Sequence, residues 1–380
     1  MITWEQVVQT AESIAAIQQE DGGVPWPEGH VDAWNHVECL MAMAVAGLHE
    51  PVAKGYDWLA RHQRPDGSWA MKIQNGTPVE RGGESNHAAY IAVGVWHNYL
   101  VTGKDPGRLW PTVKRALDYV AGLQTERGEI VWERDARGVP AGYALLTGCA
   151  SIHQGLRCGV LLADHLGDPQ PHWELAADRL AHVLTTHPEA FADKSRFSMD
   201  WYYPVLGGAV RGPAAKELIE REWATFVVPG LGIRCVSDQP WVTGAETCEL
   251  VLALDALGER ERALSLYADV QHLRHEDGSY WTGWQFANGK HFPHERSGYT
   301  AAAWILAADA LYDFTAGAGI FRDAHAGAIF RDAHAGAIFR DVHAEDAFLD
   351  VPAPAVRAST RECGCILYGT AQVTPPTDVR

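Results

Sequence analysis

A short phrase recurs in degraded form along this chain and limits what it can fold into; its fullest copy is Gln63-Arg64-Pro65-Asp66-Gly67-Ser68-Trp69. Further copies run from Gln19 to Trp26, from Gln124 to Trp132 and from Gln271 to Trp281. Each copy closes an amphipathic segment and supplies a turn built on glycine, which takes positive φ without strain. The Trp that follows is suited to pin the turn against a neighbouring helix. The pattern therefore predicts a repeated helical unit.

Two kinds of helical segment alternate along the chain. The first kind is amphipathic and carries charge: 4–18, 52–62, 110–124, 172–187, 214–228 and 260–274. The second kind is rich in Ala, Gly, Leu and Val and nearly uncharged beyond its first turn: 35–47, 86–100, 148–165, 201–210, 245–257 and 298–314. Helices with one polar face suit a surface, and helices that are apolar all round are buried. Alternation with a period of about fifty residues predicts an all-α (α/α)6 toroid, with the apolar six as the inner ring.

We expect this toroid domain to occupy residues 1–316. Beyond it, the segment Ile320 to His325 recurs as Ile329 to His334 and Ile338 to His343, which makes a repeat of nine residues, and a Pro- and Thr-rich stretch follows. Repeats this similar indicate recent duplication more than selected structure. Residues 317–380 are therefore expected to form a flexible tail.

Composition excludes some classes of partner. The formal net charge of −17 argues against nucleic acid or an anionic membrane surface as a constitutive partner. The longest apolar stretches, 40–47 and 301–308, are far shorter than the roughly 20 residues that span a bilayer, so we expect no stable membrane insertion. The seven scattered cysteines favour reduced thiols, and the N-terminus lacks the pattern of a signal peptide. We therefore expect a cytoplasmic protein.

Acidic residues gather where the predicted inner helices begin. Inner helices of such a toroid run parallel, so their N-terminal ends meet at one mouth. Five acids come from different ends: Glu38, Glu84, Asp200, Glu246 and Glu295. Because like charges and partial burial raise the pKa of a carboxyl group, we expect at least one of them to act as a general acid. Taken singly, each acid is better explained as a helix cap or an ion-pair partner.

Histidines and aromatic residues accompany these acids. The candidate substrate-binding residues are Trp34, His36, His87, His153, Trp201, Tyr202, Tyr203 and Tyr299. The three histidines occupy similar positions on the first three inner helices, where they would bind a metal, shuttle protons or simply form structural hydrogen bonds. Aromatic walls stabilise a carbocation, pack an isoprenoid chain or stack on sugar rings. They favour a hydrophobic or ring-shaped ligand without choosing between these.

The phrase of Gln, acidic turn, Gly and Trp resembles the QW motif of squalene-hopene cyclases. Over roughly residues 1–316 the chain is similar to the superfamily of terpene cyclases and protein prenyltransferase β-subunits. The resemblance implies an enzyme that acts on an isoprenoid or lipid-like substrate in the central cavity. The chain departs from the family in lacking the Asp-x-Asp-Asp and Asp-Asp-x-x-Asp motifs, and it has length for one toroid only.

The resemblance also implies a zinc site. Protein prenyltransferases hold zinc with Asp-x-Cys at the fifth inner helix and a His at the sixth. Here the fifth helix opens with Glu246-Thr247-Cys248, Ser297 takes the position of the family His, and His294 lies just upstream. Cys248, Glu246 and His294 are thus the candidate ligands, although a buried Cys is otherwise a small core residue. The partner α-subunit of such enzymes is not encoded here.

We therefore expect a prenyltransferase-like or terpene-cyclase-like enzyme with Glu246, Asp200 or Glu84 as its acid. Two alternatives stay open. One is a carbohydrate-active (α/α)6 enzyme, a glycosidase or lyase, that uses two of the same carboxylates on a glycan. The other is a non-catalytic ligand-binding toroid.

Overall fold

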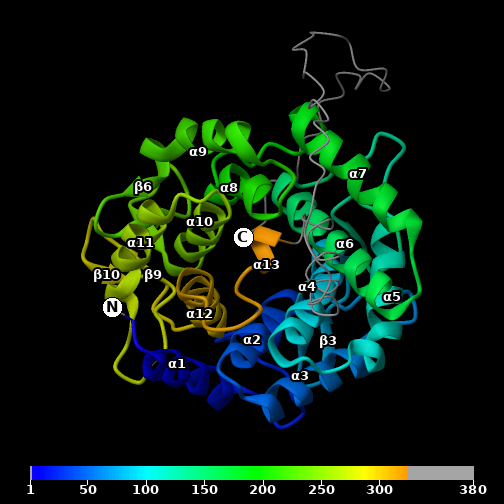
Figure 1. The fold of residues 1–380 in the computed structure, drawn as a ribbon, viewed down its shortest axis with the longest axis horizontal. Coiled ribbons are helices and arrows are strands. Elements are labelled where there is room, and N and C mark those ends of the chain that lie inside the picture. The colour runs from blue at the N-terminus through cyan, green and yellow to red at the C-terminus, as the bar shows by residue number, and fades with distance from the viewer. Residues whose placement is uncertain (1, 324–380) are drawn as a thin grey trace, which may run out of the picture.

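The computed structural model describes residues 2–323, and its long helices form two concentric rings (Figure 1). The inner ring consists of α2 (Ala33–Val45), α4 (Ser85–Thr102), α6 (Leu146–Leu166), α8 (Ser198–Leu206), α10 (Gly244–Ala256) and α12 (Gly298–Tyr312). The outer ring consists of α1 (Trp4–Ile17), α3 (His49–His62), α5 (Trp110–Ala121), α7 (Pro171–Thr186), α9 (Gly212–Phe226) and α11 (Arg260–Asp269). Short 3₁₀ turns are η1 (Pro106–Arg108), η2 (Pro188–Ala190) and η3 (Val270–Leu273). The predicted (α/α)6 toroid is confirmed.

Burial follows the two kinds of sequence pattern. In the inner helix α12 every residue from Thr300 to Leu311 is buried, because the helix is enclosed by neighbours on all sides. In the outer helix α3 the buried residues are Val52, Gly55, Tyr56, Trp58 and Leu59, which lie on one face. Each fully buried large aliphatic side chain stabilises the fold by roughly 1.5–3 kcal/mol. The apolar inner helices therefore carry most of the core.

The recurrent phrase clamps one outer helix to the next. Gln63 Nε2 donates to the carbonyl oxygens of Gly67, in its own turn, and of Thr112 on α5, both at 2.9 Å. Gly67 has φ +96°, and a Cβ there would lie 2.0 Å from the carbonyl oxygen of Arg115. Only glycine fits this close approach. The phrase thus encodes a joint between neighbouring repeats.

The same joint recurs along the ring. Gln124 donates to Gly128 and Ala176, and Gln18 donates to Gly22 and Pro51. The first copy therefore begins at Gln18, the C-cap of α1, and not at Gln19 as its sequence suggests. Where the ring closes on itself, Gln9 of α1 provides the joint instead. Its side chain accepts from Arg274 Nη2 at 2.5 Å and donates to the carbonyl oxygen of Glu276 at 3.1 Å.

Short antiparallel strands, which the sequence did not indicate, lie in the connections that surround the inner helices. They are β1 (His30–Val31), β2 (Lys72–Gln74), β3 (Thr77–Glu80), β4 (Gly83–Glu84), β5 (Glu133–Arg134), β6 (Val227–Val228), β7 (Gly232–Arg234), β8 (Trp241–Thr243), β9 (Gly283–Gln285) and β10 (Lys290–His291). The sheet orders are β1-β2-β3, β4-β5 and β10-β9-β8-β7-β6. Segments of two to four residues carry too little alternation to be recognised.

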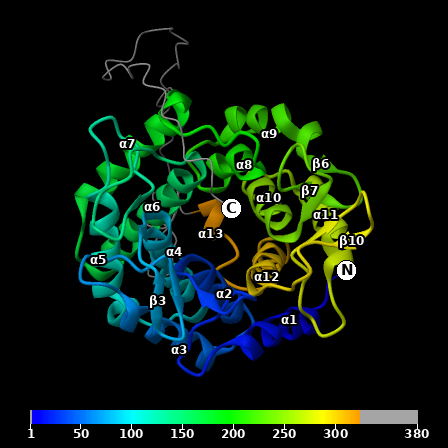
Figure 2. The same cartoon turned by 180° about the vertical axis from the view of Figure 1, so that it is seen from behind.

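A final helical turn, α13 (Ile320–Asp323), lies at the centre of the ring in both views (Figures 1 and 2). Gln154 Nε2 of α6 donates to the carbonyl oxygen of Ile320 at 2.9 Å. Arg211 Nη2 donates to that of Phe321 at 2.7 Å. The Ile320 and Phe321 side chains are buried, so this turn belongs to the core.

The described toroid therefore extends past the boundary expected at residue 316, through residues 317–323. The rest of the expected tail, 324–380, with the second and third nine-residue copies, lies outside the described residues. No helix of the described range combines the length and the apolar character needed to cross a membrane.

Candidate active site

The axis of the toroid is lined by residues that share one helical position. Glu38, Tyr90, Ser151, Tyr203 and Glu249 each stand sixth in their inner helices, and all five line one small central cavity. Because the inner helices are parallel and packed side by side, equivalent positions point the same way. The sixth position therefore faces the axis.

Glu249 is held by three tyrosines. Its carboxyl accepts from the hydroxyl of Tyr203 at 2.7 Å, from that of Tyr299 at 2.6 Å, and from that of Tyr202. The side chain is 2% exposed. Two neighbouring inner helices, α8 and α12, thus fix the orientation of this carboxyl group.

Two buried carboxyl groups influence each other at the axis. Burial raises the pKa of Glu249 to about 7; the nearby Glu246 also raises this pKa, and the hydrogen bonds from the three tyrosines lower it. Burial also raises the pKa of Glu38 well above its usual range, with smaller contributions from Glu249 and Asp32. The pair therefore retains a proton near neutral pH, which a general acid requires.

Asp32 lies at the mouth, before the first residue of α2. Its carboxylate accepts from the Asn35 backbone N–H at 2.9 Å, from Asn35 Nδ2 at 2.6 Å and from Trp26 Nε1 at 2.5 Å. It is 5% exposed. These contacts hold the carboxylate in one orientation, as an N-cap that also faces the site.

Glu84 and His87 meet beside Asp32, as their positions at the start of α4 predicted. His87 Nε2 lies 3.0 Å from Glu84 Oε2 and 4.0 Å from Asp32 Oδ1. Burial raises the pKa of Glu84, and His87 partly opposes this effect. The imidazole links two acids across the mouth.

Trp34 forms the aromatic centre of the site. Its ring lies 5.8 Å from that of Tyr299, 5.9 Å from Tyr90, 6.4 Å from His87 and 6.5 Å from Tyr203. Trp34, Tyr203 and Tyr299 were expected to bind substrate, and the structure brings them together. Tyr202 joins them through Glu249.

The three histidines do not converge, because two of them serve packing. His36 Nε2 lies 3.0 Å from the carbonyl oxygen of Gly55, its Nδ1 accepts from the Val24 N–H at 3.1 Å, and burial lowers its pKa to about 4. His153 Nδ1 lies 2.8 Å from the carbonyl oxygen of Gly207. Both rings satisfy backbone groups between helices, so only His87 reaches the mouth.

Asp200 and Trp201 face away from the axis. Both line a lateral cleft of about 830 Å³ between α7 and α9. Asp200 Oδ1 accepts from the Thr147 hydroxyl at 2.6 Å. Trp201 Nε1 donates to the carbonyl oxygen of Leu218 at 3.0 Å, and its ring stacks on Phe226. The expectation that these two residues share the central site is therefore wrong.

The expected zinc ligands are not assembled. Cys248 is fully buried, Glu246 Oε1 accepts from Cys235 Sγ at 3.3 Å, and His294 packs on Trp281. Within residues 2–323, no three His, Cys, Asp or Glu side chains are arranged to hold a metal ion. The arrangement of a prenyltransferase site is absent from this part of the chain.

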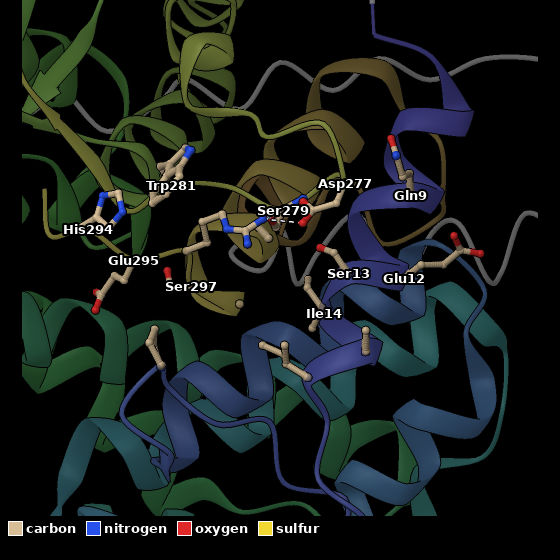
Figure 3. Close-up of a pocket in the computed structure, with 16 residues that line it drawn as sticks. Gln9, Glu12, Ser13, Ile14, Asp277, Ser279, Trp281, His294, Glu295 and Ser297 are labelled. Atoms are coloured by element: carbon tan, nitrogen blue, oxygen red, sulfur yellow. Dashed lines mark hydrogen bonds and ion pairs between the residues drawn. The ribbon is translucent and has the colours of Figure 1, made fainter. Parts of the chain in front are cut away.

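Glu295 lies in a second cleft at the seam of the ring. Figure 3 shows Glu295, His294 and Trp281 on one side and Gln9 and Glu12 of α1 on the other. The cleft measures about 810 Å³. Burial and then nearby Glu28 raise the pKa of Glu295. This acid is thus outside the central cavity.

Glu249, Asp32 and Tyr90 are site residues that the set of predicted acids and binding residues omitted. Glu249 follows Glu246 by three residues, inside an otherwise largely apolar helical stretch, and that position was the available signal. Asp32 has the sequence position of an ordinary cap, so nothing in the sequence distinguished it.

No protein-family model matches the chain. The chain is 55% identical over 325 residues to a protein of Mycolicibacterium hassiacum described as MMP endo-(1,4)-3-O-methyl-alpha-D-mannosidase, covering 85% of this chain and 90% of that protein. A solved D-mannose isomerase superimposes with a TM-score of 0.62 at 13% identity, covering 82% of this chain and 96% of the other. A wild-type glycosidase superimposes with a TM-score of 0.64 at 13% identity, covering 83% and 96%. At this identity the two structures show the shared fold alone.

These findings overturn the resemblance to terpene cyclases and prenyltransferases. The M. hassiacum protein acts on a glycan, and the similar solved structures include glycosidases. The expectation of an isoprenoid-processing enzyme is therefore wrong, and the carbohydrate-active alternative is the better supported. The QW-like phrase misled because it marks a joint between helices and not a chemistry.

Proposed function

Because the chain belongs to the family of the M. hassiacum endo-(1,4)-3-O-methyl-α-D-mannosidase, we propose that this enzyme hydrolyses internal linkages of (1→4)-linked 3-O-methyl-α-D-mannose chains. Family membership carries the proposal. The buried carboxyl groups on the toroid axis and at its mouth support it, because glycosidases use a pair of carboxyl groups on either side of the scissile bond.

Glu249 is the proposed general acid. With a pKa of about 7 it holds a proton at and below neutral pH and gives it to the leaving glycosidic oxygen. The tyrosine hydroxyls stabilise the carboxylate that remains once the proton has left, since each is a hydrogen-bond donor to it.

Asp32 is the proposed second carboxylate. Its hydrogen bonds from Trp26 and Asn35 hold it at the mouth, where it activates a water molecule or attacks the sugar. Glu38 interacts electrostatically with both Asp32 and Glu249. This row of acids supports a reaction that needs one protonated and one ionised carboxyl group.

The proposed sugar-binding surface is formed by Trp34 and Tyr299, with Glu84 and His87 at its edge. Aromatic faces suit the apolar faces of sugar rings, and the O-methyl groups of such a substrate enlarge its apolar area. The carboxyl and imidazole groups suit hydroxyl groups, with which they exchange hydrogen bonds.

Cleavage products test the proposal. The protein is incubated with (1→4)-linked α-mannose oligosaccharides of one length, either 3-O-methylated or unmethylated, and products are measured by mass spectrometry. We expect internal fragments from the methylated chain, faster than from the unmethylated chain, and a rate about 10³-fold lower with Glu249→Gln. Release of single terminal sugars only, or no cleavage by folded protein, would contradict it.

A further inference from the structure

The turn α13 closes the end of the toroid opposite the mouth. Besides the bonds from Gln154 and Arg211 to its carbonyl oxygens, Arg322 Nε lies 3.2 Å from Asp255 Oδ2 at the end of α10. Arg322 Nη2 lies 2.8 Å from Asp313 Oδ1 just after α12. Contacts from several inner helices thus hold this turn on the axis.

Phe321 of α13 contributes to the wall of the central cavity. Its side chain is 6% exposed and lines the same cavity as Glu38 and Glu249. This cavity measures about 10 Å³, room for about one water molecule. Leu206 and Leu252 complete the apolar side of its wall. The ring is therefore the part of the cavity wall contributed by the C-terminal segment.

We propose that Phe321 is a positioning residue of the catalytic cavity, whose ring seals the lower end of the toroid so that water reaches Glu38 and Glu249 only from the mouth. This inference rests on the proposed function, in which Glu249 is the acid. The first copy of the nine-residue repeat, which we expected to be without structure, thus forms the lower wall of the catalytic cavity.

The seal has an electrostatic consequence. Burial is the largest cause of the raised pKa of both Glu249 and Glu38. Removing the ring admits water from below, lowers the cost of ionisation and lowers both pKa values. Other titratable groups facing this pair remain in place: Asp32, Tyr90, Tyr202, Tyr203, Glu246, Cys248 and Tyr299.

The repeat supplies a matched control. Deleting residues 320–328 places Ile329-Phe330-Arg331-Asp332 directly after Gly319 and so restores the Ile-Phe-Arg-Asp sequence of α13. Only the length of the following segment changes. The test variant replaces the Phe of all three copies, Phe321→Ala, Phe330→Ala and Phe339→Ala, so that a later copy cannot replace the first.

Two readouts test the seal. One is the pH dependence of kcat/KM on the methylated oligosaccharide. The other, without substrate, is the infrared band of protonated carboxyl groups as pH rises above 5, where buried acids dominate it. In the triple alanine variant we expect both midpoints to fall by about one pH unit. In the deletion variant we expect both to match the parent protein.

Unchanged midpoints in a folded triple variant, or a shift of equal size in the deletion variant, would refute the seal. If the alanine variant does not fold, the triple Phe→Leu variant is used, and a smaller shift in the same direction is expected. The infrared readout does not need activity. A protein that cleaves none of these sugars would therefore still report on the seal, which separates its failure from that of the proposed function.

Discussion

Glu249 and Asp200 lie near the starts of neighbouring inner helices, and burial raises the pKa of both. Glu249, sixth in α10, faces the axis and meets three tyrosines. Asp200, third in α8, faces a lateral cleft and meets Thr147. Three positions along an α-helix place two side chains roughly 60° apart around the helix, and here this difference puts Asp200 in the lateral cleft while Tyr203, sixth in α8, lines the central cavity. A raised pKa therefore does not identify a catalytic acid unless the side chain also faces the substrate.

The largest expected contrast is between neutralising each acid. Glu249→Gln removes the proposed proton donor and should lower kcat by about 10³-fold, within the range typical of a general acid. Asp200→Asn should leave kcat within about twofold. Initial rates on the methylated oligosaccharide measure both. Equal losses of kcat in the two folded variants would contradict the assignment of the catalytic acid to the axis and not to the lateral cleft.

The two tryptophans extend the contrast to binding. Trp34→Ala should lower kcat/KM by about 10- to 100-fold, mostly through KM, because the proposed sugar-stacking face is lost. Trp201→Ala should leave the KM of folded protein unchanged and lower stability by about 3–5 kcal/mol, since its ring packs on α9. Kinetics and denaturant unfolding measured on both variants separate the two roles.

The hydrogen bonds to Glu249 and Asp200 allow the two acids to be compared by the pH dependence of activity. The acid must be protonated, so activity should fall as pH rises through about 7, the pKa of Glu249. The Tyr299 hydroxyl lowers this pKa, so Tyr299→Phe should raise it and move the alkaline limb upward by no more than about one unit. Thr147→Val should raise the pKa of Asp200 in the same way yet leave the rate profile in place. If the pH dependence of the rate shifts in Thr147→Val and not in Tyr299→Phe, the general acid is Asp200 in the lateral cleft.

The smallest effect on activity is expected at His36. His36→Ala leaves the buried Val24 N–H without its acceptor and should cost about 1–3 kcal/mol of stability. Activity per folded molecule should change little, because the ring lies between α2 and α3. Thermal unfolding and active-site titration measure the two quantities. A loss of kcat without a loss of stability would instead indicate that His36 takes part in the reaction.

The rings of the toroid could be predicted because the inner segments are apolar all round and the outer ones are not. Glu38 and Glu84 lie on the axis and at the mouth as expected, since a helix start near the mouth is enough when the side chain also faces inward; their part in catalysis stays a prediction. Asp200 and Trp201 do not lie where we expected, because the direction in which a side chain points from its helix is set by how that helix packs against its neighbours. Aligning the inner helices on their sixth residues would have selected Glu38 together with Glu249.

Other features had no signal in a single sequence. The strands around the mouth are too short to show alternation, and Asp32 has the position of an ordinary cap. The inward turn of α13 depends on long-range contacts of Gln154 and Arg211. Activity was misjudged for a physical reason: the phrase around Gln63 is shaped by the contact between outer helices, and that contact is compatible with unrelated reactions.

The contact of Gln9 with Arg274 and Glu276 brings the first outer helix against the turn that follows the last one. The outer ring of helices is therefore closed, although its first and last helices are not joined by a peptide bond, because side-chain hydrogen bonds connect them. At this seam the outer ring is closed by side-chain contacts between its first helix and the turn after its last, with no peptide bond joining the two.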